Sequence, residues 1–196
     1  MMYSQSNHYN QFKKLSVPKK WWVFFHPFKA KKALLISTKV IKTADSIRKT
    51  TVLDGDKSGG QVDAFRHAFW MASLHIKIGK SAARSLGKAH EKENYQYFKD
   101  NKLEEGIIPD KASMDMDLYN NEMGLSLVKK RDKITKKELV RKIIIAIKEG
   151  KMKIIKKDQK KRFLTCTGEV IQRNSLKGKW VNTKCIVNSN YLAKVN

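Results

Sequence analysis

The stretch "VDAFRHAFW", residues 62–70, places three ionisable side chains in a run that otherwise has the composition of a buried helix face. Asp63 and His67 are four residues apart and therefore share one face of a helix, with Arg66 beside them. Charged side chains are rarely buried without partners. The spacing predicts either a structural polar network or a site in which Asp63 orients the His67 ring or acts with it as a ligand.

Two further segments carry polar side chains beside small residues. "GKAHEKEN" supplies His90 next to Glu91, and "MDLYNNEMG" supplies Asp117 and Asn121 one helical turn apart. Gly124, one turn further on, would let another backbone approach closely. We expect the three helices to pack together, so that these side chains converge.

These residue types indicate a chemistry. Histidine, aspartate, arginine and asparagine are costly to bury for structure alone. His and Asp bind metals or transfer protons, while Arg and Asn stabilise developing negative charge, so enzymes that hydrolyse esters or phosphoesters use this set. We predict a hydrolase acting on a phosphate- or ester-bearing substrate such as a lipid or lipid-linked precursor. The predicted catalytic residues are Asp63, Arg66, His67, His90, Glu91, Asp117 and Asn121.

A second candidate site is the turn "DGDKSGGQVD". Asp54, Asp56 and Ser58 follow the 1-3-5 oxygen spacing of a calcium loop. Phe65 stands at the twelfth place instead of the usual glutamate, so Asp63 at the tenth would have to close the site. We expect Ca²⁺ or another divalent metal at these four residues, and no organic cofactor. The alternative is an ordinary Asx-turn that caps a helix.

Helical periodicity predicts the elements that position these residues. "LDGDKSGG" is a turn that leads into the helix carrying His67, and Thr135 with Glu138 forms a capping box. Pro27 suits the first turn of a helix, and Gly79 suits a helix end. The predicted helices cover about 27–49, 61–78, 81–98, 112–130 and 135–149.

Residues after 150 have a different character. "MKIIKK", "RFLTCTGEVIQ" and "KGKWVNTKCIV" are short, β-rich and separated by turn residues. We therefore predict a mainly α protein, a compact domain of about five helices with a small C-terminal β hairpin. The predicted division is a basic and aromatic segment at 1–26, of which residues 1–20 look mobile, a helical core at 27–150 and a β-rich element at 151–196.

The charge points to an anionic partner. The 42 Lys and Arg against 18 Asp and Glu give a net charge of +24, which attracts a nucleic acid or an anionic membrane surface. "KKWWVFFHPFKAKK" gathers five aromatic rings among lysines, so they either sit at lipid headgroups, with at least two exposed, or staple a helix to the core. The alternative function is accordingly a non-enzymatic protein that binds RNA, the ribosome or a membrane, with the polar residues purely structural.

The location of the protein and the oxidation state of its cysteines are predicted from the signals that the sequence lacks. The N-terminus lacks the apolar core of a signal peptide, and the longest apolar runs are too short to span a bilayer. We expect a cytoplasmic protein, with peripheral membrane attachment or export without a signal peptide as alternatives. Cys166 and Cys185 form no CxxC pair and are predicted to be two reduced, partly buried thiols.

The pattern DAFRHAxW, then HE, then MDLxNNxxG resembles that of an uncharacterised bacterial domain family. The match covers residues 54–127 well and the flanks loosely. The resemblance implies a mostly helical fold that gathers the patterned residues, but it implies no activity. Members occur as short stand-alone proteins and at the C-terminal ends of secreted effectors or toxins. If this protein is an effector, the resemblance implies an immunity protein as its partner. The patterned residues are Asp63, Arg66, His67, Trp70, His90, Glu91, Asp117, Asn120, Asn121 and Gly124.

Overall fold

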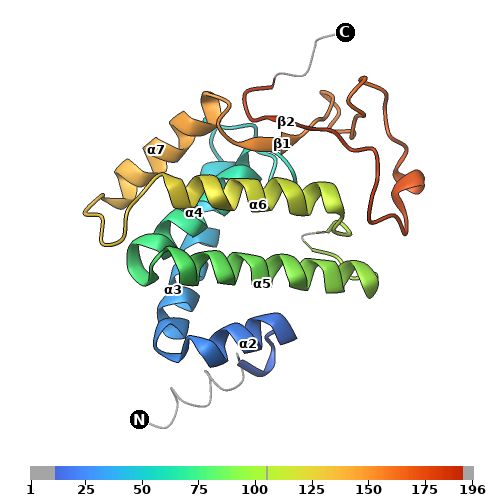
Figure 1. Ribbon diagram of the computed structural model, residues 1–196. Coiled ribbons are helices and arrows are strands. Elements are labelled where there is room, and N and C mark those ends of the chain that lie inside the picture. The colour runs from blue at the N-terminus through green and yellow to red at the C-terminus, as the bar shows by residue number, and fades with distance from the viewer. Residues whose placement is uncertain (1–11, 105, 192–196) are drawn as a thin grey trace.

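The computed structural model describes residues 12–104 and 106–191. It confirms a mainly α fold with a small C-terminal β hairpin (Figure 1). Residues 1–11 and 192–196, which belong to the predicted N- and C-terminal segments, lie outside the described residues. The elements of the described part are α2 (Val17–Phe25), α3 (Pro27–Arg48), α4 (Gln61–Ile78), α5 (Lys80–Lys99), α6 (Lys111–Ser126), α7 (Lys136–Lys148), β1 (Lys153–Ile155) and β2 (Ile186–Asn188).

Helix ends follow local capping chemistry. The capping box that begins α7 is present: the Thr135 side chain accepts from the Glu138 amide, and the Glu138 carboxylate accepts from the Thr135 amide. A second box, between Asp110 and Ser113, begins α6. α6 ends at Ser126, four residues earlier than predicted.

The helix α2 corrects the prediction that residues 17–20 are mobile. Pro18 lies in its first turn, where a missing amide hydrogen costs nothing. Trp22 anchors the helix: its ring is 5% exposed, and its Nε1 donates to Ala82 O at 3.1 Å and Ser85 Oγ at 2.9 Å, both in α5. α2 therefore lies along α5, which in turn packs against α6 (Figure 1).

Helix α4 is the centre of the molecule. Most of its residues are buried, and it packs against α3, α5, α6 and α7. Gly124 makes the closest of these approaches possible, because a Cβ built there would lie 2.3 Å from Ala68 O in α4. The prediction that Gly124 admits another backbone is confirmed. The tight contact brings the polar residues of α6 to those of α4.

The hairpin is attached to α6 by Asn120. β1 and β2 are antiparallel, with Lys153 opposite Asn188. The Asn120 amide donates to Lys153 O at 2.9 Å and accepts from Lys153 N at 2.8 Å. Asn120, one of the residues of the family pattern, therefore fixes the hairpin rather than facing the other polar residues.

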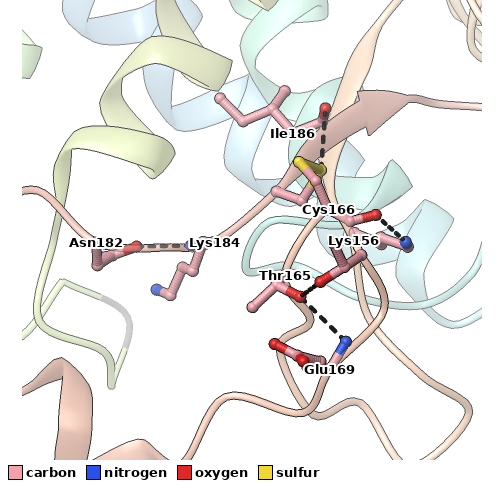
Figure 2. Close-up of a disulfide and its surroundings, with 9 residues drawn as sticks. Lys156, Thr165, Cys166, Glu169, Asn182, Lys184 and Ile186 are labelled. Atoms are coloured by element: carbon pink, nitrogen blue, oxygen red, sulfur yellow. Dashed lines mark hydrogen bonds between the residues drawn. A yellow bond between two sulfur atoms is a disulfide. The ribbon is translucent and has the colours of Figure 1, made fainter.

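The two cysteines form a disulfide, so the prediction of reduced thiols is wrong. Cys166 and Cys185 are joined with their Cα atoms 4.9 Å apart (Figure 2). The loop after β1 folds back on itself, and Cys185 N donates to Leu164 O at 3.1 Å, which brings the two cysteines together despite their separation in sequence. Lys156 Nζ donates to Cys166 O beside the bond.

Among the described residues, none of the helices combines the length and the apolar character that crossing a bilayer requires.

Candidate functional site

The structure brings the polar residues of α4 and α6 together around His67, whose side chain is 2% exposed. His67 Nδ1 lies 3.2 Å from Asn121 Oδ1. On the other side of the ring, Nε2 lies 3.3 Å from Asp117 Oδ1 and 3.6 Å from Asp63 Oδ1. We call Asp63, Arg66, His67, Asp117 and Asn121 the polar cluster.

Asp63 is held from two directions. Its Oδ2 accepts from the Gly59 amide at 2.7 Å, in the turn before α4. Its Oδ1 accepts from Arg66 Nη2 at 2.6 Å, and the same guanidinium nitrogen lies 3.1 Å from His67 Nε2. The loop before α4 and the first two turns of that helix therefore both hold Asp63 in the cluster.

His67 is a neutral imidazole in this environment. Because Nδ1 faces the carbonyl oxygen of Asn121, it carries the ring hydrogen, and Nε2 is left as an acceptor. Burial lowers the pKa of His67 to about 4, and the charge of Arg66 acts in the same direction. At neutral pH the ring can accept a proton at Nε2.

His90 lies near the cluster but has the opposite protonation state. Its ring centroid is 6.1 Å from that of His67. Its Nε2 lies 3.2 Å from Glu104 Oε1, and its Nδ1 lies 3.5 Å from Glu93 Oε2. Burial alone would lower the pKa of His90, but hydrogen bonds to Glu104 and Glu93 raise it to about 9. His90 is therefore a cation that can donate a proton.

Two further buried carboxyls near the histidines have raised pKa values. Glu91 is buried on α5, where Asn94 Nδ2 donates to its Oε2 at 3.2 Å, and burial raises the pKa of Glu91 to about 7. Burial, with the nearby charge of Asp63, raises the pKa of Asp117 well above its usual value. Both carboxyls thus bind protons more strongly than exposed ones do.

Two carboxylates of the predicted calcium loop, Asp54 and Asp56, accept hydrogen bonds from backbone amides, and Ser58 takes part through its backbone. Asp54 accepts from the amides of Gln61 and Asp56, and it caps the start of α4. Asp56 accepts from the Ser58 amide at 3.0 Å and pairs with Lys157 Nζ. Such contacts are typical of an Asx-turn that caps a helix, which is the alternative given above for this loop. Calcium binding at the loop stays a prediction.

Three residues near His90 escaped the sequence analysis. Glu93 follows His90 by three residues, and its position one helical turn on is a signal that could have identified it. Lys19 forms an ion pair with Glu93, and Glu104 approaches His90 from the loop after α5. No spacing rule identifies these two, because they reach His90 through the tertiary fold. Trp70 packs edge-on against His90.

A cavity of about 510 Å³ leads to the buried residues. Arg66, His67 and His90 contribute to its lining, while most of the remaining lining comes from apolar side chains of α2, α3 and α5. Two residues of the polar cluster, Arg66 and His67, therefore border a space that suits an apolar group.

Comparison with known proteins identifies the family of the chain. The chain belongs to the family described as a domain of unknown function, DUF6973, whose model matches residues 20–151. That range contains every predicted catalytic residue, and the match confirms the resemblance to an uncharacterised domain family. No curated protein and no solved structure matches the chain.

Proposed function

We propose that the chain is a hydrolase of lipids that carry ester or phosphate groups. One observation carries the proposal: the 510 Å³ cavity has largely apolar walls and is also lined by Arg66, His67 and His90. Ligand sites commonly combine an apolar wall with a few convergent polar groups. An acyl chain would occupy the apolar part, and its head group would meet the two cations and the neutral imidazole.

The proton transfers follow from the two protonation states. His67 Nε2 takes a proton from a water molecule as the water oxygen attacks the phosphorus or carbonyl carbon. The bond to the leaving oxygen breaks, and His90 gives that oxygen a proton. Asn121 holds the His67 ring through Nδ1, so that Nε2 faces the reacting water.

Arg66 stabilises the negative charge that develops on the substrate. Its side chain is 21% exposed and contributes to the cavity lining, so its guanidinium can form hydrogen bonds to a phosphate or an oxyanion. The charge of Glu91 helps to keep His90 protonated.

An anionic membrane surface is the partner we propose. Four of the five N-terminal rings are exposed, including Phe28 at 93%, whereas Trp22 is buried. Lysines at 20, 29, 31 and 32 flank these rings, and each adds about 1 kcal/mol of attraction to an anionic leaflet, whereas Lys19 is paired with Glu93. Because α2 and α3 supply both the exposed rings and the cavity wall, a lipid could enter directly from the membrane.

The disulfide supports a location outside the cytosol, reached by export. Thiols of cytosolic proteins are generally kept reduced, so the Cys166–Cys185 bond favours an oxidising compartment. In that setting the protein would act as an effector, and an immunity protein would be its partner.

The hydrolase proposal is tested with purified full-length protein and vesicles of mixed phosphatidylglycerol and phosphatidylcholine. Released products are identified by mass spectrometry. His67→Gln should lower the rate by about 100-fold or more, because the base is lost. His75→Gln is the matched control, since His75 lies on the same helix, is also buried, and bonds to Leu125 O away from the cavity.

Circular dichroism verifies that both variants fold. The proposal is wrong if the folded wild-type protein releases no product, or if His67→Gln leaves the rate unchanged. Vesicle or RNA binding without turnover would favour the non-enzymatic alternative.

A further inference from the structure

We infer that Asp63, His67 and Asp117 form a binding site for one divalent transition-metal ion. Each residue offers one ligand atom, and these three atoms lie within 4.8 Å of one another. All three side chains are buried. The inference goes beyond the proposed hydrolase and concerns a different state of His67. An ion on Nε2 would occupy the lone pair that otherwise accepts a proton, so in the ion-bound protein a water on the ion would supply the attacking oxygen. Binding of an ion can be measured whether or not the protein turns over a lipid.

The His67 ring is oriented as metal-binding histidines are. Its Nδ1 hydrogen is donated to Asn121 Oδ1, which leaves the Nε2 lone pair directed toward Asp63 and Asp117. Histidine ligands usually donate their second ring hydrogen to a carbonyl or carboxylate that fixes the tautomer. Asn121 is thus a positioning residue, and Gly87 leaves room for its amide, since a Cβ there would lie 3.2 Å from Asn121 Nδ2.

Asp117 provides a second, independent observation. Its side chain is buried, and its Oδ1 accepts no hydrogen bond from another group in the described residues. This oxygen lies 3.3 Å from His67 Nε2, which is also an acceptor in this tautomer. Two acceptors at that distance need a proton or a cation between them. A metal ion satisfies both atoms at once, together with Asp63 Oδ1.

Arg66 supplies positive charge on the Asp63 side of the site. Its Nη2 contacts Asp63 Oδ1 and His67 Nε2, the same atoms that would bind the ion. An ion that takes over these two acceptors would leave the guanidinium turned toward the cavity that it lines. There it would face an anionic ligand, so the ion and Arg66 can act side by side.

The ligand atoms indicate which ions fit. Imidazole nitrogen suits Zn²⁺, Fe²⁺ and Ni²⁺, whereas carboxylate oxygen suits Mg²⁺, Ca²⁺ and Mn²⁺. One nitrogen with two carboxylates favours Zn²⁺ or Mn²⁺ over ions that prefer oxygen alone. Three protein ligands leave a coordination position open, as in catalytic rather than structural zinc sites.

The test is calorimetric titration of untagged, metal-stripped full-length protein with Zn²⁺ and, separately, Mn²⁺. We expect one ion to bind per chain. Asp117→Asn keeps the size of the side chain but removes the ligand charge, so it should weaken binding by more than about 100-fold, beyond the effect of an outer-shell change. Asp115→Asn, on the same helix but with its carboxylate paired to Lys111 at the surface, should bind the ion like wild type.

Asn121→Ala should weaken binding less than Asp117→Asn does, because it removes orientation and not a ligand. His67→Gln gives a second ligand variant if Asp117→Asn fails to fold by circular dichroism. The inference is overturned if neither ion binds saturably to wild type, or if both ligand variants bind as wild type does. Metal binding without lipid turnover would contradict the hydrolase alone, whereas turnover by a protein that binds neither ion would contradict the metal site alone.

Discussion

At the scale of single residues, His67 and His90 show how neighbouring groups of one type acquire different protonation states. For His67, burial and the charge of Arg66 outweigh the nearby carboxylate of Asp63, and the pKa falls to about 4. His90 lies between two glutamates, and its pKa rises to about 9. Hydrogen bonds to two glutamates at His90, and the neighbouring guanidinium at His67, thus distinguish a proton donor from an acceptor over a ring-to-ring distance of 6.1 Å.

The His90 environment predicts a pH-dependent stability. A pKa raised from 6.5 to about 9 stabilises the folded protein fully below pH 6.5, and this stabilisation is lost as the pH rises through 9. The shift corresponds to on the order of 3 kcal/mol. The free energy of unfolding of wild type minus that of His90→Gln, measured with urea, should therefore shrink as the pH is raised from 6 to about 10. A difference that stays constant over this range would contradict the ion pairs of His90.

Sequence reasoning could identify the polar cluster because its signal is local. Asp63 with His67, and Asp117 with Asn121, are each four residues apart, which places each pair on one helix face. It could not identify Glu104, which reaches His90 from a loop without periodicity. Spacing also could not decide between a calcium loop and a helix cap around Asp54, since both use the same side chains near glycine.

At the scale of elements, α2 was missed because it is only nine residues long and ends just before Pro27, where the next helix begins. Only Trp22 is buried, while Trp21, Phe24 and Phe25 are exposed and stack on one another. Periodicity alone does not distinguish so short an apolar run as helix or strand.

The two tryptophans of α2 should respond differently to replacement. Trp21→Ala removes an exposed ring, so it should reduce sedimentation with anionic vesicles while leaving the melting temperature unchanged. Trp22→Ala removes a buried ring and two hydrogen bonds, and should cost about 3–5 kcal/mol of stability. Sedimentation and thermal melts of both variants check this. If Trp21→Ala and wild type bind vesicles equally, the Trp21 ring does not contribute to membrane binding.

Gly124 should tolerate no side chain. In Gly124→Ala the new Cβ would lie 2.3 Å from Ala68 O, so α4 and α6 must move apart, at a cost of about 1–3 kcal/mol. Chemical denaturation measures this loss. Ser126→Ala, at an exposed position of the same helix, should change stability by less than about 0.5 kcal/mol. Similar stabilities of the two variants would contradict the close packing of the helices.

At the scale of the whole molecule, the disulfide tethers the C-terminal loop to β2. Closing a loop of this length in the unfolded chain gives about 3 kcal/mol. Replacing Cys166 and Cys185 together by Ser should lower the free energy of unfolding by that amount and keep the helical circular dichroism signal. A thiol reductant should produce the same loss in wild type and none in the double variant. A reductant effect of equal size in both proteins would contradict a role for the disulfide.

The fold class was predictable because helix caps and periodicity extend over most of the chain. The disulfide was not, because no spacing rule pairs two cysteines 19 residues apart. Their approach depends on backbone bonds such as that from Cys185 N to Leu164 O, which exist only after the loop has folded back.

The position of the disulfide also bears on the order of events during synthesis. Both cysteines follow the family-matched range, residues 20–151, and Cys185 leaves the ribosome after every described helix. Chains generally fold N-terminal parts first as they emerge. The two thiols therefore become available for pairing only after the residues of all these helices have been synthesised, so the helical part of the chain can fold without the bond.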